Sequence, residues 1–260
     1  MAYETILFDI TDSVATITLN RPDKMNSFSE KMHEELRAIM PELESDAVRA
    51  VLITGAGRAF GAGADLSESS AESGNFDAGE TLEKNYNPLI LLIRNLEKPV
   101  ISAVNGVAAG ASMSLALAAD ICIAARSSYF LQAFCHIGLI PDAGSTYFLP
   151  RLVGSGKAMG LAMLGDKIPA EEAEKMGLIW SVVDDEELMS TATSLARNMA
   201  KGPTAGLGKI KKAMNASLSN DLKAQLDVER DLQREAAKSE DFAEGVSAFA
   251  EKRKPVFKGK

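Results

Sequence analysis

Residues 98–112 read K-P-V-I-S-A-V-N-G-V-A-A-G-A-S, an apolar run that ends in a turn of small residues. The run has the length and composition of a buried strand, and an Ala-rich helix is expected from about Ala111 to Ala119. Small residues in the turn Asn105–Gly110 let backbone N–H groups approach a ligand closely. The stretch therefore predicts a strand, a turn and a helix, with a candidate ligand site at the turn.

A second stretch also has an apolar run followed by small residues. The apolar run V-L-I-T (51–54) precedes F-G-A-G-A-D-L at Phe60–Leu66. In both cases we expect the small residues to lead into a helix, whose first N–H groups are unpaired and whose dipole favours negative charge. Either stretch alone is typical of an ordinary strand-to-helix connection. Two such N–H groups aimed at one oxygen would form an oxyanion hole, so the pair favours an enzyme.

Strands and helices are expected to alternate along much of the chain. Alternating apolar residues predict a strand at 14–19, and T-D-S (11–13) predicts a hairpin turn before it. Ser29 is expected to cap a helix that carries apolar residues at helical spacing, and residues 79–97 are expected to be helical. The pattern predicts an α/β fold without the G-x-G-x-x-G motif of a dinucleotide site, and no internal repeat is visible.

Two further segments divide the chain. Residues 67–78 are rich in Ser, Glu, Gly and Asp and predict a surface loop. After the segment W-S-V-V (180–183) the sequence is expected to be helical to its end, with a boundary near Pro203. Three helices are expected beyond that boundary, at 205–218, 221–237 and 240–252. We therefore predict a core over residues 1–200 and a C-terminal helical region over residues 201–260.

Composition narrows the class of protein. The 260 residues are 46% hydrophobic and 25% charged, with a net charge of −8, which argues against a nucleic-acid surface. No apolar stretch is long enough to span a membrane, and the N-terminus lacks the pattern of a signal peptide. Cys122 and Cys135 suggest neither a disulfide framework nor a zinc site, and are expected to be reduced core thiols. A cytoplasmic protein is expected.

Asp142, in I-P-D-A-G-S, is the candidate acid–base group. An aspartate after a proline is most often a turn or N-cap residue. Its apolar surroundings on both sides suggest partial burial, which would raise its pKa and make it a usable base. His136 is a secondary candidate with a structural role expected, and His33, on a charged helix, is expected to be solvated.

Basic residues flank the candidate site. Arg21, Lys24 and Arg58 lie in predicted loops, either as solvated charges or as contacts for a phosphate group. The C-terminal E-K-R-K-P-V-F-K-G-K (251–260) is most simply a solvated tail, or alternatively covers a ligand of a neighbouring subunit.

Four segments in this order resemble the crotonase (enoyl-CoA hydratase/isomerase) superfamily: L-N-R-P-D-K-M-N-S, G-A-G-R-A-F-G-A-G-A-D-L, K-P-V-I-S-A-V-N-G-V-A-A-G-A-S and I-G-L-I-P-D-A-G-S-T-Y-F-L-P-R-L-V-G. The resemblance implies a spiral of ββα units with a C-terminal helical region that drives trimers, often dimers of trimers. It also places the two oxyanion-hole N–H groups on Ala64 and Ala111.

The resemblance implies a path for coenzyme A as well. Arg21, Lys24 and Arg58 are similar to the basic residues that line its nucleotide end. The expected adenine and pantetheine contacts are Met25, Ala62, Asp65 and Leu66. Coenzyme A arrives as part of the substrate, so neither a metal nor another cofactor is implied.

Departures from the family pattern indicate a subclass. The positions of the two hydratase glutamates hold Ser114 and Phe134, neither of which can transfer a proton to or from water. Asp142 replaces the first Gly of the usual I-P-G-A-G-G. Aryl-CoA dehalogenases share such an aspartate, but their assisting histidine falls on Asn87. The similarity is strongest to isomerases of phenylacetate degradation, which act on 1,2-epoxyphenylacetyl-CoA and shift 3-enoyl-CoA double bonds.

We therefore predict an acyl-CoA isomerase in which Ala64 and Ala111 hold the thioester oxygen and Asp142 moves the proton. Two alternatives stay open. One is an enoyl-CoA hydratase that adds water with Asp142 alone, and the other is a non-catalytic relative that binds acyl-CoA or RNA.

Overall fold

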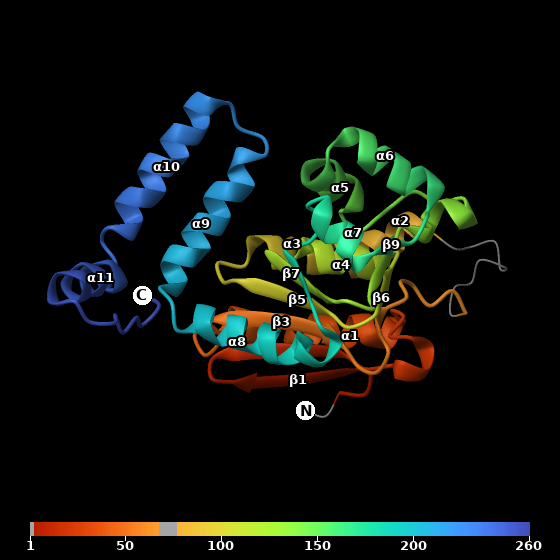
Figure 1. Cartoon of the computed structure of the whole chain (residues 1–260), viewed down its shortest axis with the longest axis horizontal. Helices are drawn as coiled ribbons and strands as arrows, with labels where there is room; N and C mark the ends of the chain where they lie inside the picture. Colours follow the sequence, from red (N-terminus) through yellow and green to blue (C-terminus); the bar gives the residue numbers. More distant parts are fainter. Residues whose placement is uncertain (1–2, 68–76) are drawn as a thin grey trace.

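Two β-sheets form the framework of the protein, which a computed structural model describes over residues 3–67 and 77–260 (Figure 1). The larger sheet has the order β1-β2-β3-β5-β7-β10 and the smaller one β4-β6-β8-β9. The strands of the larger sheet are Ile6–Thr11, Val14–Leu19, Ala50–Gly55, Val100–Val104, Ile121–Ala125 and Ser181–Val183. Those of the smaller sheet are Ala59–Gly61, Val107–Ala109, Tyr129–Leu131 and Ile168–Pro169. Most of the predicted loop 67–78 lies outside the described residues.

A repeat that the sequence hides is visible in the sheets. Each of β3, β5 and β7 is followed at once by a short strand of the smaller sheet, namely β4, β6 and β8. Neighbouring members of each set run parallel. The protein thus has the expected α/β architecture of repeated ββα units. Matching positions of the three units hold mostly different residues, so the repeat is not visible in the sequence.

The hairpin and first helix form as predicted. β1 and β2 pair antiparallel around Asp12 and Ser13, whose positive φ angles of 54° and 61° fit a two-residue turn that matches the twist of the strands. The Ser29 side chain accepts a hydrogen bond from the N–H of Met32 and caps α1 (Glu30–Glu44). The apolar stripe of α1 is buried against the core.

The two Gly/Ala stretches differ from the prediction in one respect. Each begins with a strand of the smaller sheet, and only the second continues directly into a helix, α4 (Ala111–Ala118). After the first stretch, Ala64 instead forms a bridge to Phe28, and the next described helix is α2 (Ala78–Thr81). The expectation that both stretches lead into a helix is therefore confirmed only for the second one.

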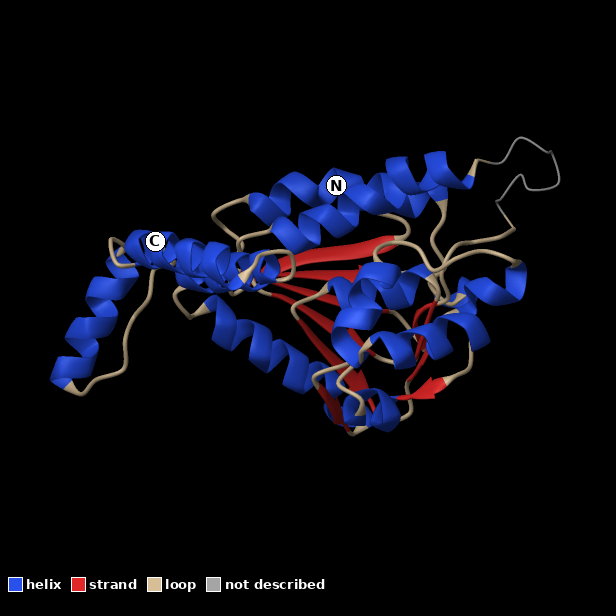
Figure 2. Ribbon diagram, turned by 90° about the horizontal axis from the view of Figure 1, so that it is seen from above, coloured by secondary structure: helices blue, strands red, loops and turns tan. Residues whose placement is uncertain are grey.

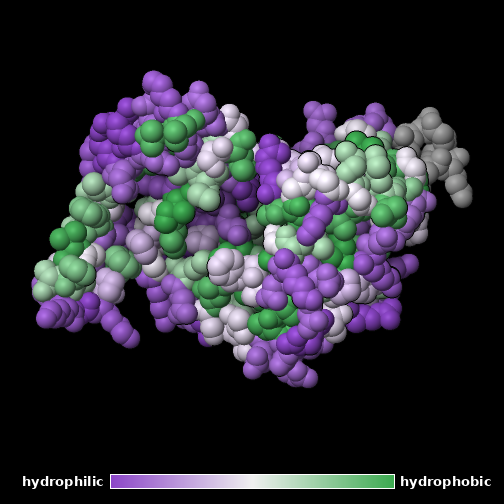
Figure 3. Space-filling model, turned by 45° about the horizontal axis from the view of Figure 1, so that its top comes forward, coloured by the Kyte–Doolittle hydropathy of each residue, from purple (hydrophilic) through white to green (hydrophobic). Residues whose placement is uncertain are grey.

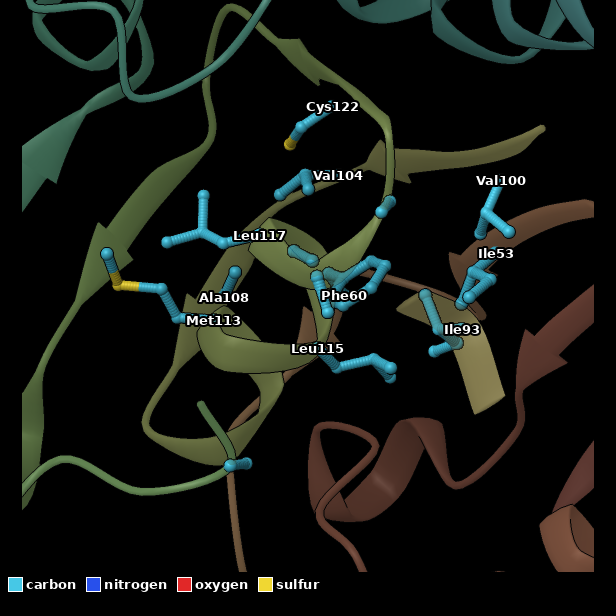
Figure 4. Close-up of a cluster of buried hydrophobic side chains, with 14 of the residues drawn as sticks. Ile53, Phe60, Ile93, Val100, Val104, Ala108, Met113, Leu115, Leu117 and Cys122 are labelled. Atoms are coloured by element: carbon cyan, nitrogen blue, oxygen red, sulfur yellow. The ribbon is translucent and has the colours of Figure 1, made fainter. Parts of the chain in front are cut away.

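Helix α4 lies at the centre of the core. All eight of its residues are buried, as expected for a helix that is apolar on every side. Figure 4 shows its side chains Met113, Leu115 and Leu117 among those of strands and neighbouring helices, including Phe60. A helix held on all sides gives its N-terminus a fixed position, which suits a site that needs rigid N–H groups.

The remaining helices cover the sheets (Figure 2). The expected helical segment 79–97 consists of α2, a π-helical turn η3 (Leu82–Tyr86) and α3 (Asn87–Asn95). The other helices of the core are α5 Ser145–Val153, α6 Ser155–Leu164, α7 Ala170–Lys175 and α8 Leu188–Ala200, with short 3₁₀ turns η1 Pro22–Lys24, η4 Ala133–Ile137 and η5 Asp185–Glu187. None of the described helices has the length and apolar character needed to cross a membrane.

Helices α9 (Thr204–Ser217), α10 (Leu222–Ala236) and α11 (Glu240–Glu251) agree with the predicted ranges to within two residues. They extend away from the sheets as an arm, drawn in blue in Figure 1. The chain is not helical to its end, however, and its tail is not simply solvated. The backbone N–H groups of Lys258 and Gly259 donate to the buried Asp241 carboxylate at 2.6 and 2.8 Å, so the tail folds back on α11.

Candidate active site

The two Gly/Ala turns touch each other. Gly63 has a φ of +88°, and a Cβ built on it would lie 3.1 Å from the Ala109 carbonyl oxygen and 3.5 Å from the Ala111 nitrogen. The Gly63 N–H donates to the Ser112 hydroxyl of α4 at 3.0 Å. Glycine is therefore required at position 63 both for its backbone conformation and for the close approach.

Ala64 and Ala111 each present a backbone N–H at this contact. In the bridge between Phe28 and Ala64, the Phe28 N–H donates to the Gly63 carbonyl, and the Asp65 N–H donates to the Phe28 carbonyl. The N–H of Ala64 takes no part in the bridge. Ala111 is the first residue of α4, where N–H groups have no partner within the helix. Among the described residues, no acceptor takes either N–H. The arrangement suits a ligand oxygen, as the predicted oxyanion hole requires.

Asp142 lies between η4 and α5, with its backbone fixed and its carboxylate unengaged. Its carbonyl oxygen accepts from the Ser114 hydroxyl and the Ser145 N–H, both at 2.9 Å. Its side chain does not cap α5, and Oδ1 is buried with no partner among the described groups. Burial raises the pKa of this carboxyl to about 6. Such a carboxylate can exchange a proton near neutral pH.

Ser114 joins Asp142 to the oxyanion turn. Its hydroxyl is 3.3 Å from the Gly110 carbonyl oxygen, 2.9 Å from that of Asp142 and 2.7 Å from the Ser145 hydroxyl. Gln132 donates to Ser145 at 2.8 Å and completes the network. At a position where the family resemblance gives hydratases a glutamate, this chain therefore has a small residue that fixes the Asp142 loop.

Phe134 occupies the second glutamate position and is an apolar wall. It is buried, and a Cβ on Gly110 would lie 3.8 Å from its ring atom Cζ. The ring thus lies next to the turn that leads into Ala111. It contributes shape and excludes water, but no proton transfer.

Arg21 and Asp65, both predicted to contact coenzyme A, form a pair with each other. Their charged groups are 2.9 Å apart, and Arg21 also donates to the Ser27 carbonyl at 2.7 Å. Hydrogen bonding from Ser67 and the Arg21 guanidinium holds the pKa of Asp65 below its ordinary value. In the structure, this pair ties the first loop to the Gly/Ala turn.

The other predicted coenzyme A residues lie on the same side of the molecule. The N–H of Ala62 donates to the Met25 carbonyl at 2.9 Å, which brings the two loops together. Met25 and Leu66 are exposed, as are Lys24 and Arg58. These exposed residues remain predicted contacts, with two positive charges among them.

The two histidines differ from each other and, in one case, from the prediction. His33 is buried rather than solvated, because helical spacing puts it on the apolar face of α1 despite its charged neighbours. Burial lowers its pKa to about 4. The His136 side chain is exposed on η4, with a ring nitrogen 3.2 Å from the Leu164 carbonyl, which agrees with a structural role.

The cysteines are free. Cys122 is buried, and burial raises the pKa of its thiol to about 12, whereas Cys135 is only half-buried. No group of side chains suited to hold a metal ion occurs among the described residues. Sequence reasoning missed Tyr86, whose ring packs on Phe28, the residue that bridges to Ala64, because a π-helical turn leaves no recognisable signal in a single sequence.

A buried, unengaged carboxylate beside two touching backbone turns defines an acid–base enzyme with the crotonase fold. Residues 9–260 match the family described as enoyl-CoA hydratase/isomerase. The chain is 52% identical over 260 residues to the 1,2-epoxyphenylacetyl-CoA isomerase of Escherichia coli K12, with 99% of each chain covered. It is 48% identical to a Rhodobacter capsulatus protein named "probable enoyl-CoA hydratase", with 100% of each chain covered.

Solved structures agree. The enoyl-CoA hydratase of Bacillus anthracis superimposes with a TM-score of 0.92 at 34% identity, covering 99% of this chain and 100% of that chain. The protein therefore belongs to the enoyl-CoA hydratase/isomerase family.

Proposed function

We propose that the protein is an acyl-CoA isomerase that moves a proton with Asp142. The observation that carries the proposal is the buried Asp142 carboxylate, whose Oδ1 has no partner among the described residues and whose pKa is raised to about 6. The 52% identity to 1,2-epoxyphenylacetyl-CoA isomerase supports an enoyl- or epoxyphenylacetyl-CoA thioester as substrate.

The proposed reaction begins at the thioester oxygen. The N–H groups of Ala64 and Ala111 would hold this oxygen and stabilise the enolate that forms when a proton leaves the α-carbon. Asp142 would take that proton from a 3-enoyl thioester and return it at the γ-carbon, which moves the double bond to the 2-position. With an epoxide, Asp142 would assist ring expansion to the oxepin.

Binding of the coenzyme A portion forms part of the same proposal. Lys24 and Arg58 are exposed and positively charged, and would contact phosphate groups. Met25, Ala62 and Leu66 would line the path of the pantetheine, while Arg21 and Asp65 would hold the loops. Coenzyme A would enter with the substrate, with no metal or separate cofactor.

Hydration is the second candidate, supported by the name of the Rhodobacter capsulatus relative. Family hydratases hold water between two glutamates, and Ser114 and Phe134 stand in their places. The Ser114 hydroxyl is engaged with the Asp142 and Gly110 carbonyls, and Phe134 is apolar. We therefore expect hydration to be slow.

The experiment follows conversion of a 3-enoyl-CoA to the conjugated 2-enoyl thioester by ultraviolet absorbance. Wild type should react rapidly, and Asp142→Asn should be slower by about 10³-fold, since it retains the shape but not the base. Circular dichroism of the variant provides the folding control. Equal rates for the two proteins would contradict the proposal, as would hydration of crotonyl-CoA faster than isomerisation.

We further propose that the arm α9–α11 assembles the protein into a homotrimer or a dimer of trimers in the cytoplasm. The arm exposes large apolar side chains on all three helices, namely Ile210, Met214, Leu222, Leu226 and Phe249. Figure 3 shows hydrophobic surface, in green, on this part of the molecule. Exposed apolar area of this kind is typical of subunit interfaces. Native mass spectrometry would give three or six copies, and a monomer would contradict this assignment.

A further inference from the structure

Tyr86 places an unused hydroxyl inside the protein. It is the last residue of the π-helical turn η3, and only 5% of its surface is exposed. Its hydroxyl makes no hydrogen bond with any described residue. Isolated π-helical turns occur frequently at functional sites. The Tyr86 hydroxyl oxygen is not among the fully buried polar atoms that lack a partner, so solvent or a ligand can reach it.

Two aromatic neighbours fix the Tyr86 ring. It meets the edge of Phe28 at 5.5 Å between ring centroids and that of His33 at 4.4 Å. Phe28 and His33 stack on each other at 5.2 Å. The three rings form one rigid cluster, in which burial keeps His33 neutral at pH 7.

The aromatic cluster contacts the candidate active site through Phe28. Phe28 bridges directly to Ala64, one of the two predicted oxyanion residues. The charge of Asp142 also acts on Tyr86. Burial and, after it, this charge raise the pKa of the phenol, so Tyr86 stays protonated and can serve as a hydrogen-bond donor.

These positions define the space that a bound acyl group would enter. In the proposed function, a thioester whose carbonyl oxygen lies at Ala64 and Ala111 extends its acyl group toward Asp142, and the Tyr86 ring packs on Phe28, which bridges to Ala64. A purely hydrocarbon acyl group would leave the phenol hydroxyl unpaired. An acyl group with its own oxygen atom would satisfy it.

We propose that Tyr86 is a specificity-determining residue that selects acyl groups carrying an oxygen atom beyond the thioester, such as an epoxide or hydroxyl on a ring. The inference rests on the proposed function for its substrate class, since it assumes a CoA thioester in the same cavity. Tyr86 donates to that oxygen, while Asp142 remains the group that moves a proton.

The test is the ratio of the dissociation constants of two thioesters. Isothermal titration calorimetry would compare phenylacetyl-CoA with 2-hydroxyphenylacetyl-CoA, two thioesters that differ by one ring oxygen. Wild type should prefer the hydroxylated thioester by about tenfold, the worth of one hydrogen bond of about 1.4 kcal/mol. Tyr86→Phe preserves the ring contacts with Phe28 and His33 and should reduce the ratio to about one.

Tyr3→Phe is the matched control, because it removes a hydroxyl from a ring that also meets a phenylalanine edge, that of Phe8 at 6.5 Å. It should keep the wild-type ratio. A Tyr86→Phe protein that keeps the tenfold preference, or a wild type without preference, would overturn the inference. Since the ratio requires no turnover, it fails independently of the proposed function, which fails if wild type does not isomerise a 3-enoyl-CoA.

Discussion

Asp65 and Asp142 are the same residue type and each lies next to an alanine, yet their environments in the protein are opposite. Asp65 is held by the Arg21 guanidinium and by the N–H and hydroxyl of Ser67, and its pKa is lowered. The Asp142 Oδ1 is buried without a partner among the described groups, and its pKa is raised to about 6. The difference shows that the hydrogen-bond and charge partners of each carboxylate, rather than the residue type, decide which carboxylate can react.

The two carboxylates therefore have different roles, one structural and one chemical. A carboxylate engaged with an arginine is a stable anion that fixes two loops, and it is a poor base because its pKa is low. A carboxylate without partners costs stability, but it takes up a proton near neutral pH. The two loops thus supply rigidity and chemistry separately.

The first effect is expected for the structural partner, in Asp65→Asn. Removing the charge leaves Arg21 without its ion pair, so the free energy of unfolding should fall by about 2 kcal/mol at pH 7, as urea titration would show. Because the folded-state pKa of Asp65 is lowered, this stabilisation is present above the unfolded pKa near 4 and is lost as the pH falls through the lowered value. An unchanged midpoint of urea unfolding at pH 7 would show that the Asp65 carboxylate does not stabilise the fold, and would contradict the contrast with Asp142.

The next effect is on the rate. If ionised Asp142 is the base, kcat/KM for a 3-enoyl-CoA should be about tenfold lower at pH 5 than at pH 8, with a midpoint near 6. Activity must rise with pH, because the base acts only when deprotonated. A stopped-flow profile over this range measures the midpoint, and the residual activity of Asp142→Asn should lack it. A flat wild-type profile would show that another group moves the proton.

The last effect concerns the stability cost of the reactive carboxylate. The folded-state pKa of Asp142 lies above its ordinary value of 3.8, so the folded protein binds more protons between about pH 4 and pH 6, and stability falls as the pH rises through this window. Asp142→Asn avoids that cost. It should be more stable than wild type by up to about 3 kcal/mol at pH 8 and equal to it below pH 4.

Thermal melts at the two pH values would measure this difference. It has the opposite sign from the effect of Asp65→Asn at neutral pH, which makes the pair of variants its own control. A destabilised Asp142→Asn at pH 8 would mean that the carboxylate has a stabilising partner.

Much of the fold could be predicted from the sequence. The capped helix at Ser29 follows from local patterns, and so does the hairpin at 11–13, because turn and cap chemistry act over a few residues. The three C-terminal helices were also predicted closely. The smaller sheet was not, because strands as short as Ala59–Gly61 carry no periodic signal and form only by pairing with distant strands.

The candidate site was predictable in part. The Gly/Ala turns and Asp142 follow from residue types and from the family resemblance, while their contact through Gly63 appears only in the structure. His33 was expected in solvent, yet it is buried together with Met32, Leu36 and other residues of the buried face of α1. The mutual pairing of Arg21 and Asp65 joins residues 44 positions apart, beyond the reach of local reasoning.

By itself, the sequence determined the order of elements, the small residues at both turns and the presence of a lone aspartate in apolar surroundings, because each depends on near neighbours. Only the tertiary structure decided which backbone turns touch, which aspartate goes unpaired at Oδ1, and that Tyr86 packs against Phe28 and His33. Those properties depend on distances between segments far apart in the chain and on exclusion of water, and both exist only once the chain has packed.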